Sequence, residues 1–395
     1  AAVARQLQAL GHEVEIVTAM PNYPTGRIAA GYRRRILVHE NLDGVEVTRT
    51  WLYVSMGRGV KRLISYLSFA VTATIGLARR QRPDYIFVES PPLFLVITAA
   101  LFARIWRADL IVNVSDLWPD AAVDLGVLPN GRALALARRL ERWCYRRATI
   151  VNAVTDGIGN AIAPQRAPVA KLRTLPNGVD IDLFRPDRGR KDRLAELGLP
   201  DSRLILYTGN IGYAQGLDSI VHAAAKAGPD VTMAFVGDGS DRAHLERLAT
   251  ELGAGNIRFV PPVPLEVVAE LLPLTSAVVV ALRDLPTNDG ARPSKIFPAF
   301  ASGRPIIYAG SGEGADIVAA AAAGIVLPNH DADAITDVMR HLATNPAEGD
   351  RMGVNGRQAA EQRFSWASLV GKWVDSLPQD NSNAKRRNRR LNECD

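Results

Sequence analysis

Two successive blocks of alternating apolar strands and amphipathic helices constrain what this chain can fold into. The strand candidates are 14–18, 45–50, 85–89, 110–114, 150–153 and 172–175 in the first block, and 204–208, 232–237, 257–260, 277–281, 305–308 and 324–327 in the second. Strands that alternate with helices favour a parallel sheet with helices on both faces. We therefore expect an α/β protein with two doubly wound, Rossmann-like domains that face a central cleft.

The boundary between the two blocks is marked by turn and linker residues. Pro176-Asn-Gly178 ends the first block, and the charged stretch 184–191, which contains Pro186, is typical of a linker. A chain of 395 residues also has room for two domains of ordinary size. We expect a first domain at 1–181, a second at 182–378, and a disordered basic tail at 379–395 because that tail is almost devoid of apolar residues.

The first residues belong to the middle of a folding unit. AAVARQLQALGHEV predicts a helix, then Gly11 and a strand, which is the second part of a βαβ unit. We therefore expect that the first strand of the first domain is missing from this sequence.

Charge and cysteine usage limit the compartment and the partners. The formal net charge is +6, which favours an acidic partner such as a phosphate or an anionic membrane surface, and we expect no nucleic acid. Cys144 and Cys394 lie far apart, so a disulfide framework is not expected and a reducing, cytoplasmic location fits.

One apolar stretch raises the question of a membrane. The residues from Leu63 to Ala78 are apolar with Ser and Thr among them, and Arg62, Arg79 and Arg80 flank them. The stretch is shorter than the roughly 20 residues that span a bilayer. Either it is a core helix, or it lies in the membrane interface with its arginines on lipid phosphates, peripheral to the inner face of the plasma membrane.

Two strand ends in the second block are suited to phosphate. Strand 204–208 runs into Gly209-Asn-Ile-Gly212, so Gly209, Asn210 and Gly212 form a turn that precedes a helix. Strand 232–237 runs into Gly237, Asp238 and Gly239. Glycine turns let the backbone approach an anion, and free N–H groups at a helix start attract it. The alternative is that both are ordinary turns that bind nothing.

A cation near a helix start is a second indication of an anion site. In Arg292-Pro-Ser-Lys295, Pro293 and Ser294 are typical of a helix start, and a lysine in the first turn is unfavourable unless an anion is bound. We therefore assign Lys295 to a diphosphate, held also by backbone N–H groups of Gly212 and Ser294. Other donor-site candidates are Arg283, Arg292, Glu313 and Gly314.

The first block offers carboxylates at one strand end. Asn113-Val-Ser-Asp-Leu-Trp-Pro-Asp120 follows a buried strand, so Asp116 is expected to point at the cleft, where it could grip a sugar or assist proton transfer. Asp120 is expected to cap a helix.

Several short motifs occur together and in one order along the chain. They are Gly11-His-Glu-Val, Pro21-Asn-Tyr-Pro-Thr-Gly26, Ser115-Asp-Leu-Trp-Pro119, Pro176-Asn-Gly-Val-Asp180, Gly209-Asn-Ile-Gly212, Val236-Gly-Asp-Gly239 and Pro293-Ser-Lys295. In these motifs the chain resembles glycosyltransferase family 4, of the GT-B fold, in the bacterial surface-polysaccharide branch. It is similar to enzymes that transfer N-acetylated deoxy sugars such as fucosamine.

The resemblance carries expectations about the reaction. It implies a retaining transfer from a nucleotide-diphosphate sugar, bound mainly by the second domain, to a lipid-linked or polysaccharide acceptor on the first. The family usually carries two glutamates eight residues apart beside the donor, and this chain has Gly290 and Pro298 there. Retaining transfer of this kind needs no protein nucleophile, and we expect no cofactor and no metal.

Two other functions stay open. A sugar-nucleotide 2-epimerase could use the same fold, and so could an inactive GT-B-like binding or partner protein. A nicotinamide dehydrogenase is disfavoured because the chain has no intact Gly-x-Gly-x-x-Gly followed by an acidic residue.

Overall fold

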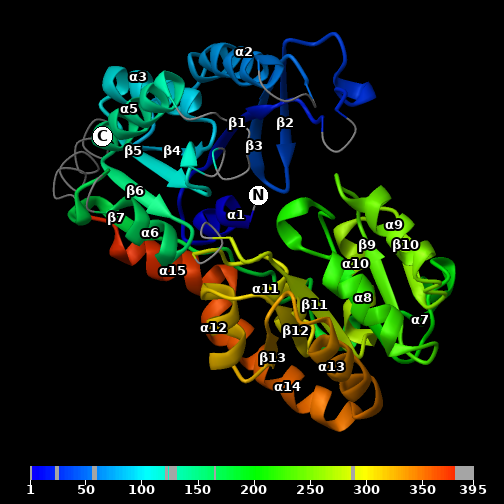
Figure 1. Cartoon of the computed structure of the whole chain (residues 1–395). Helices are drawn as coiled ribbons and strands as arrows, with labels where there is room; N and C mark the ends of the chain where they lie inside the picture. Colours follow the sequence, from blue (N-terminus) through cyan, green and yellow to red (C-terminus); the bar gives the residue numbers. More distant parts are fainter. Residues whose placement is uncertain are drawn as a thin grey trace.

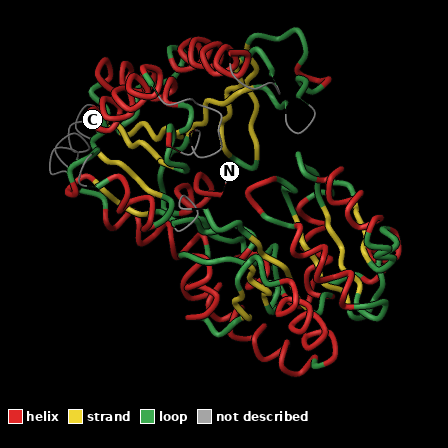
Figure 2. Tube along the Cα trace, viewed as in Figure 1, coloured by secondary structure: helices red, strands yellow, loops and turns green. Residues whose placement is uncertain are grey.

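The protein consists of two α/β lobes, which in Figure 1 run from blue through cyan to green and from green to orange. The computed structural model describes residues 2–22, 26–55, 60–120, 123, 131–163, 166–285 and 290–378. The tail expected at 379–395 and residues 23–25 of the Pro21–Gly26 motif lie outside the described residues. Strands form the centre of each lobe and helices cover them on both sides (Figure 2), as the alternating sequence pattern predicts.

The first lobe contains the following elements. They are α1 (Ala2–Ala9), β1 (Glu15–Ala19), the 3-10 helix Ala30–Tyr32, β2 (Leu37–Leu42), β3 (Val45–Thr50), α2 (Val60–Leu77), β4 (Tyr85–Ser90), α3 (Leu93–Trp106), β5 (Asp109–Val114), α5 (Arg132–Arg147), β6 (Ile150–Ala153), α6 (Asp156–Ile162) and β7 (Leu172–Thr174).

The strands of the first lobe form two sheets. One has the order β1-β3-β2 and the other the order β4-β5-β6-β7, and all neighbours are parallel except β2 and β3. Strand β2 was not predicted from the sequence. It is LVHENL, in which charged and apolar residues alternate imperfectly, so the local sequence gives no clear strand pattern. Its antiparallel pairing with β3 stabilises it as a strand.

The second lobe is built around one parallel sheet. Its elements are α7 (Lys191–Glu196), β8 (Leu204–Thr208), the 3-10 helix Tyr213–Gln215, α8 (Asp218–Ala227), β9 (Thr232–Val236), α9 (Arg242–Glu251), β10 (Ile257–Val260), α10 (Leu265–Leu271), β11 (Ala277–Ala281), α11 (Ile296–Ala301), β12 (Ile306–Ala309), α12 (Glu313–Ala320), β13 (Gly324–Leu327), α13 (Ala332–Thr344) and α14 (Pro346–Ala359). The chain then continues into a last helix, α15 (Trp366–Ser376).

The order of that sheet fixes where a ligand can bind. The strands run β10-β9-β8-β11-β12-β13, so the chain moves outward in one direction after β8 and in the other after β11. In an open parallel sheet, the crevice beyond the carboxyl ends of the strands at such a reversal is the usual ligand site. The residues after β8 and β11 therefore border this crevice.

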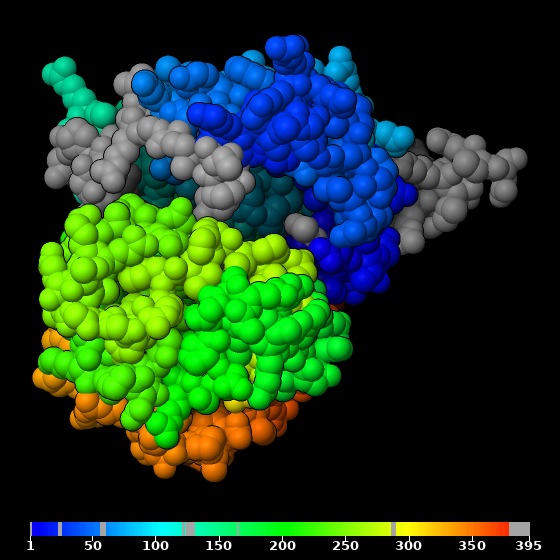
Figure 3. Space-filling model, turned by 90° about the vertical axis from the view of Figure 1, so that its right-hand side faces the viewer, coloured from blue at the N-terminus to red at the C-terminus, as the bar shows by residue number. Residues whose placement is uncertain are grey.

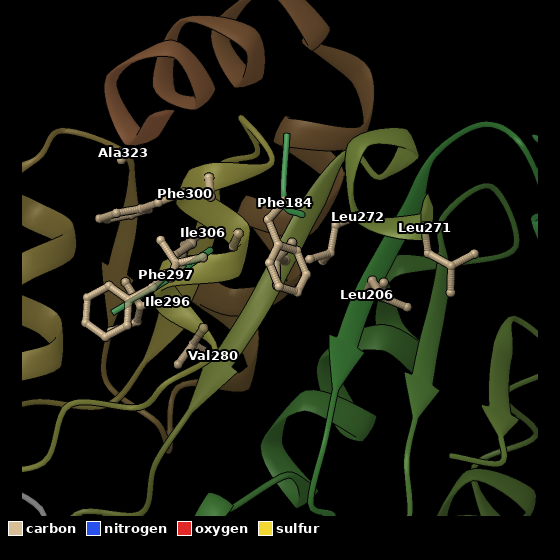
Figure 4. Packing of buried hydrophobic residues seen from close by; sticks show 14 of the residues in the cluster. Phe184, Leu206, Leu271, Leu272, Val280, Ile296, Phe297, Phe300, Ile306 and Ala323 are labelled. Carbon is tan, nitrogen blue, oxygen red and sulfur yellow. The ribbon is translucent and has the colours of Figure 1, made fainter. Parts of the chain in front are cut away.

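The core of the second lobe anchors α11, which carries residues of the predicted site at its start. Ile296, Phe297 and Phe300 of this short helix are fully buried (Figure 4), and they pack with Val280 and Ile306 of the sheet. Burial of three large apolar side chains over two turns fixes the helix on the sheet, which in turn fixes the position of Lys295 just before it.

The last helix returns to the first lobe. Val370 and Trp373 of α15 pack with Ile111 and Ile150 of the first-lobe sheet, and the ring of Trp373 meets Phe87 edge-on, with 5.8 Å between centroids. The sequence-based limits assign this stretch to the second domain, whereas its apolar face belongs to the core of the first. The periodicity of a helix shows that it has a buried face, but not which sheet covers it.

The two passages between the lobes run side by side. The Val179 amide donates to the Phe364 carbonyl oxygen over 2.8 Å, and the Trp366 amide donates to the Val179 carbonyl oxygen over 3.2 Å. Arg357 donates from Nη1 to three carbonyl oxygens, those of Ile181, Phe184 and Ala301, which ties the outgoing passage to α14 and α11.

Candidate functional site

The carboxyl end of the first-lobe sheet faces the second lobe. Asp156 and Gly157 begin α6, which two residues separate from the end of β6, and both contact Glu313 of the second lobe. Since parallel strands end at one edge, the residues after β4 and β5 lie on the same side. Figure 3 shows the two lobes meeting across a recess, which is the cleft expected from the sequence.

At the reversal of the second sheet, the turns after β8 and β9 are packed against each other. The Gly209 amide donates to the Val236 carbonyl oxygen over 2.9 Å, and the Ile211 amide donates to the Asp238 carbonyl oxygen over 2.9 Å. A Cβ on Gly237 would lie 1.9 Å from the Gly209 carbonyl oxygen, and one on Gly239 would lie 2.1 Å from that of Ile211. These glycines permit the close packing of the two turns, and the carboxylate of Asp238 accepts a hydrogen bond from Gly239.

Lys295 lies directly over the first of these turns. A Cβ on Gly209 would be 3.0 Å from Lys295 Cε and 3.5 Å from its Nζ, and Nζ stands 5.1 Å from the centroid of the Tyr207 ring. Within the part of the chain that the structure describes, no carboxylate pairs with this ammonium. Burial lowers the pKa of Lys295 to about 8. A cation that is partly desolvated and unpaired at the reversal of a parallel sheet is suited to an incoming anion.

The structure corrects the expected environment of Lys295 in one respect. The helix begins at Ile296, so Lys295 stands at the N-cap position, and Pro293 and Ser294 precede the helix instead of starting it. Ser294 itself is exposed.

The Gly212 amide, predicted to hold the diphosphate, is already engaged. It donates to Gln215 Oε1 over 3.0 Å, and Asn210 Nδ2 donates to the same oxygen over 3.3 Å. The Gln215 side chain therefore occupies these two hydrogen-bond donors of the turn. An anion would reach this amide only after the Gln215 side chain moves away, a feature that glycine spacing in the sequence does not reveal.

Arg283, which follows β11, braces the same turn. Its Nε donates to the Tyr213 carbonyl oxygen over 2.6 Å, its Nη2 donates to Asp218 Oδ2 over 2.9 Å, and its guanidinium stacks on the Tyr213 ring at 4.1 Å from the centroid. Asp218 also contacts His244 Nε2 at 2.6 Å. The sequence predicted a donor ligand here, and the structure shows a side chain that holds the turn in place.

Arg292 and Glu313 connect the two lobes. They form an ion pair with only 11% and 17% of their side chains exposed, and Arg292 Nη2 also donates to Asp156 Oδ2 over 2.8 Å. Glu313 Oε2 accepts from the Gly157 amide over 3.1 Å. Both residues were predicted as donor ligands, and in this structure their charged groups bind each other and the start of α6.

Two glycines make this contact possible. A Cβ on Gly157 would lie 2.3 Å from Gly290 Cα and 3.3 Å from Glu313 Oε2. The carboxylate of Glu313 therefore lies beside Gly290, where the family usually has a glutamate of its own. Gly314 is required for a related reason, because a Cβ there would be 2.8 Å from Pro293 Cδ.

On the opposite side of the recess, Asp116 lies in the turn after β5. Its side chain is open to solvent, yet the surrounding protein desolvates it enough to raise the pKa of its carboxyl group. Asp120, expected to cap a helix, instead pairs with Arg166 and Arg138. Burial opposes its ionisation, but these two arginines lower the pKa of Asp120 below its ordinary value.

A row of polar residues beside Asp116 was missed in the sequence. Glu89, Asn113 and Asn152 are register partners across β4, β5 and β6. Asn152 Nδ2 donates to Asn113 Oδ1 over 2.5 Å, Asn113 Nδ2 donates to Glu89 Oε2 over 2.8 Å, and the Ser115 hydroxyl donates to the same Glu89 oxygen over 3.1 Å. Asn113 and Asn152 are buried and Glu89 is exposed, so the two amides orient a carboxylate at the edge of the recess. Polar residues at equivalent positions of three successive strands were the available signal.

Among the residues that the structure describes, no group of three or more His, Cys, Asp or Glu side chains is arranged to hold a metal ion.

Comparison with protein families assigns both halves of the chain. Residues 1–178 match the family described as "Glycosyl transferase 4-like domain", and residues 190–359 match "Glycosyl transferases group 1". The chain is 30% identical over 307 residues to WcaI of Escherichia coli K12, a protein assigned to colanic acid biosynthesis as a glycosyl transferase, and the match covers 75% of each chain. It is 27% identical over 327 residues to a GDP-mannose-dependent alpha-(1-6)-phosphatidylinositol monomannoside mannosyltransferase of Mycolicibacterium smegmatis, covering 75% of this chain and 85% of that protein.

Solved structures agree on the fold. Sucrose-phosphate synthase from Thermosynechococcus elongatus superposes with a TM-score of 0.72 at 18% identity, covering 100% of this chain and 92% of that one. HepE of Anabaena, solved with UDP and glucose, gives a TM-score of 0.68 at 18% identity, covering 93% and 100%. These neighbours share two Rossmann-like domains with this protein, and together with the family matches they lead to one conclusion: the chain belongs to glycosyltransferase family 4 and has the GT-B fold.

Proposed function

We propose that this glycosyltransferase moves a sugar from a nucleoside-diphosphate sugar to a lipid-linked or polysaccharide acceptor in cell-surface polysaccharide synthesis, with retention at the transferred carbon. The observation that carries the donor class is Lys295, whose ammonium has no carboxylate partner among the described residues and is partly desolvated by burial at the reversal of the second sheet. The solved relative HepE, bound to UDP and glucose or to UDP-glucose, supports a diphosphate donor. The likeness to WcaI supports a polysaccharide pathway.

The donor diphosphate is proposed to lie over the turn Gly209–Gly212, with Lys295 on its charge. Gln215 moves off the Gly212 amide as the anion arrives, because a phosphate oxygen is a stronger acceptor than an uncharged amide oxygen. Gly237, Asp238 and Gly239 then border the nucleoside. Arg283 keeps the turn in shape from behind.

The transferred sugar is proposed to lie beside the Arg292–Glu313 pair. Glu313 stands next to Gly290, so it supplies a carboxylate near the place where this chain lacks the usual one. A sugar hydroxyl can donate to the second lone pairs of the Glu313 oxygens while Arg292 keeps the carboxylate ionised.

The acceptor is proposed to enter from the first-lobe edge, where Asp116 and the Glu89 row lie. Its hydroxyl oxygen bonds to the anomeric carbon as the bond from that carbon to the diphosphate oxygen breaks. The proton passes to the leaving phosphate oxygen on the same face, which gives retention. Lys295 stabilises the charge that accumulates on the diphosphate, and such preorganised stabilisation is usually the largest catalytic contribution.

The finer substrate identities are part of the same proposal. We take the sugar to be an N-acetylated deoxy sugar and the acceptor to be lipid-linked. A lipid-linked acceptor requires the protein to work on the inner face of the plasma membrane as a peripheral protein.

Calorimetric titration of the protein with UDP, GDP and dTDP tests the donor class. One of them should bind to the unaltered protein and bind at least about tenfold more weakly to Lys295→Ala, since each 1.4 kcal/mol is tenfold. Product analysis with the matching nucleotide sugars then separates transfer from 2-epimerisation, because an epimerase converts its substrate without any acceptor. Absence of binding for all three nucleotides would overturn the donor assignment.

A further inference from the structure

Three helices form the outer layer of the first lobe. In Figure 1, α2, α3 and α5 lie on the side of this lobe that faces away from the second one. Helix α2 packs beside α3, where the Thr98 hydroxyl donates to the Ala70 carbonyl oxygen over 3.1 Å, and α3 meets α5, where the Cys144 thiol approaches the Leu93 carbonyl oxygen. The exposed faces of these helices therefore form one surface, which we name the three-helix face.

Helix α2 turns its small residues inward and its large apolar residues outward. Ser65, Ala70, Ala73 and Gly76 are buried, and a Cβ on Gly76 would be only 2.9 Å from Thr50 and Val17 side chains of the underlying sheet. The exposed apolar residues, spaced so that they share one side of the helix, are Leu63, Ile64, Leu67, Val71 and Ile75. A helix that covers a sheet in water normally shows the opposite arrangement.

Helix α3 is apolar on both of its sides. Leu93, Val96 and Phe102 are buried against the sheet, whereas Ile97, Leu101 and Ile105 follow one another every four residues and are exposed. Together with α2 this makes a continuous run of large apolar side chains on the three-helix face. Such contiguous exposure indicates that another apolar phase covers the surface.

The charges on these helices all have one sign where they are exposed. The cationic residues within α2, α3 and α5 are Lys61, Arg62, Arg104, Arg132, Arg138, Arg139, Arg142, Arg146 and Arg147. The one acidic residue in these three sequences is Glu141, which is buried and binds Arg166. Trp143 and Leu136 are exposed between the arginines of α5.

This combination distinguishes the possible occupants. A second copy of the chain on the same face would bring two sets of arginines together, which is unfavourable. An anionic bilayer offers phosphates to the arginines and acyl chains to the apolar side chains at once. Among the helices that the structure describes, none is long and apolar enough to cross a bilayer.

We infer that the three-helix face is a membrane-docking surface, on which α2 and α3 insert their exposed apolar side chains below the headgroups of an anionic bilayer while the arginines of α5 bind the lipid phosphates. This inference rests on the membrane association proposed above and gives it a location, an orientation and two separable contributions.

Vesicle flotation tests this surface with matched variants. The probes are phosphatidylcholine vesicles and the same vesicles with phosphatidylglycerol at about one lipid in three. Val71→Glu is compared with Val354→Glu, because Val71 is 66% exposed on α2 and Val354 is 67% exposed on α14 of the second lobe. Arg142→Glu with Arg146→Glu is compared with Arg247→Glu on α9, which is also exposed.

We expect binding to the anionic vesicles to fall about tenfold or more in Val71→Glu, from the loss of an inserted side chain. At low salt it should fall at least about fivefold for each arginine of α5 replaced by glutamate, because each replacement removes a positive charge and adds a negative one. Neither control should change it, and all variants should keep the melting temperature and the nucleotide binding of the unaltered protein.

Several results would overturn the inference. Equal binding of Val71→Glu and Val354→Glu would exclude insertion through α2. A concentration-dependent dimer that Val71→Glu dissociates, with no vesicle binding, would assign the face to a second copy. The vesicle measurement needs neither donor nor acceptor, so it stands even where nucleotide titration of the same samples contradicts the proposed enzyme activity.

Discussion

The carboxylate of Glu313 accepts a hydrogen bond from the backbone amide of Gly157 over 3.1 Å, although the two residues lie in different lobes. Arg292 binds the same carboxylate and reaches Asp156 as well. Glu313 lies next to the proposed sugar site and at the same time binds the start of α6, so this contact joins the two lobes across the recess. Loss of the carboxylate has consequences for both lobes.

Glu313→Ala is expected to loosen the arrangement of the two lobes. It leaves the Gly157 amide without its acceptor and Arg292 with Asp156 alone, and Asp156 is 66% exposed and therefore a weaker partner. Small-angle scattering should show a larger radius of gyration, and amide exchange at Gly157 should accelerate. Glu246→Ala, which removes a surface pair with Arg242, is the control and should change neither quantity. Unchanged scattering and exchange in Glu313→Ala would show that the contact does not hold the lobes.

Lys295→Ala is expected to lower transfer far more than stability. One preorganised charge contact to a leaving group contributes about 2–4 kcal/mol, so turnover should fall roughly thirty- to several-hundred-fold. The apoprotein should melt at the same or a higher temperature, because the ammonium is desolvated and none of the carboxylates that the structure describes pairs with it. Lys226→Ala, which removes an exposed lysine paired with Asp333, is the control. Near-normal transfer by Lys295→Ala would assign the diphosphate to other cations.

The lowered pKa of Lys295 predicts how nucleotide affinity depends on pH. The free protein carries the ammonium charge below about pH 8 and loses it above, so affinity should be constant on the acid side and decline as pH rises through about 8. Lys295→Arg should remove the decline, since a guanidinium stays charged over this range. Calorimetric titration of UDP at successive pH values measures both proteins, and identical profiles would contradict the assignment.

The same shift has a defined sign for stability. Since the pKa of Lys295 is lower in the folded protein than the ordinary 10.5, the unfolded chain binds more protons between about pH 8 and that value. This residue should therefore make the free energy of unfolding rise with pH through that window, and Lys295→Ala should flatten that rise. Denaturant melts over the window provide the measurement.

Gly237→Ala is expected to disrupt the donor turn. Its Cβ would lie 1.9 Å from the Gly209 carbonyl oxygen, and the backbone at Gly237 has a φ of +151°, which side chains rarely adopt. We expect a loss of about 1–3 kcal/mol in the free energy of unfolding and a marked loss of nucleotide affinity. Gly255→Ala is the control, because its Cβ would meet open space. Normal nucleotide affinity in Gly237→Ala would place the nucleotide elsewhere.

Asp116→Asn is expected to separate the two substrates. Asp116 lies after β5 on the first lobe, so nucleotide affinity should stay close to normal while transfer declines. Because desolvation by the surrounding protein raises the pKa of this exposed carboxyl group, transfer by the unaltered protein should also fall on the acid side as the carboxylate is protonated. Initial rates across pH for both proteins test this, and a variant with the same acid limb as the unaltered protein would exclude Asp116 as its source.

The sequence by itself determined every described strand except β2, and their order along the chain. Strands β3, β6, β8, β10, β11 and β13 have the limits predicted from the sequence, where apolar and β-branched residues lie between turns. Strand β11 is the clearest case, because it is apolar and buried along its whole length, as a strand covered on both faces must be. The turns at Gly209, Gly237 and Gly239 were also predictable, since the tight turns that follow such strands require glycine. These are local properties, and local residues carry their signal.

The partners of the charged side chains were decided by the tertiary structure. Arg283, Arg292 and Glu313 all follow strand ends and all qualified as donor ligands, yet Arg283 binds Asp218 and the other two bind each other and Asp156. The packing of α15 against the first lobe could not be predicted either, because an amphipathic sequence does not show which sheet covers the apolar face of the helix. A long polar side chain can reach any of several partners, and which one it meets depends on how elements far apart in the sequence are brought together, a relation that no local pattern encodes.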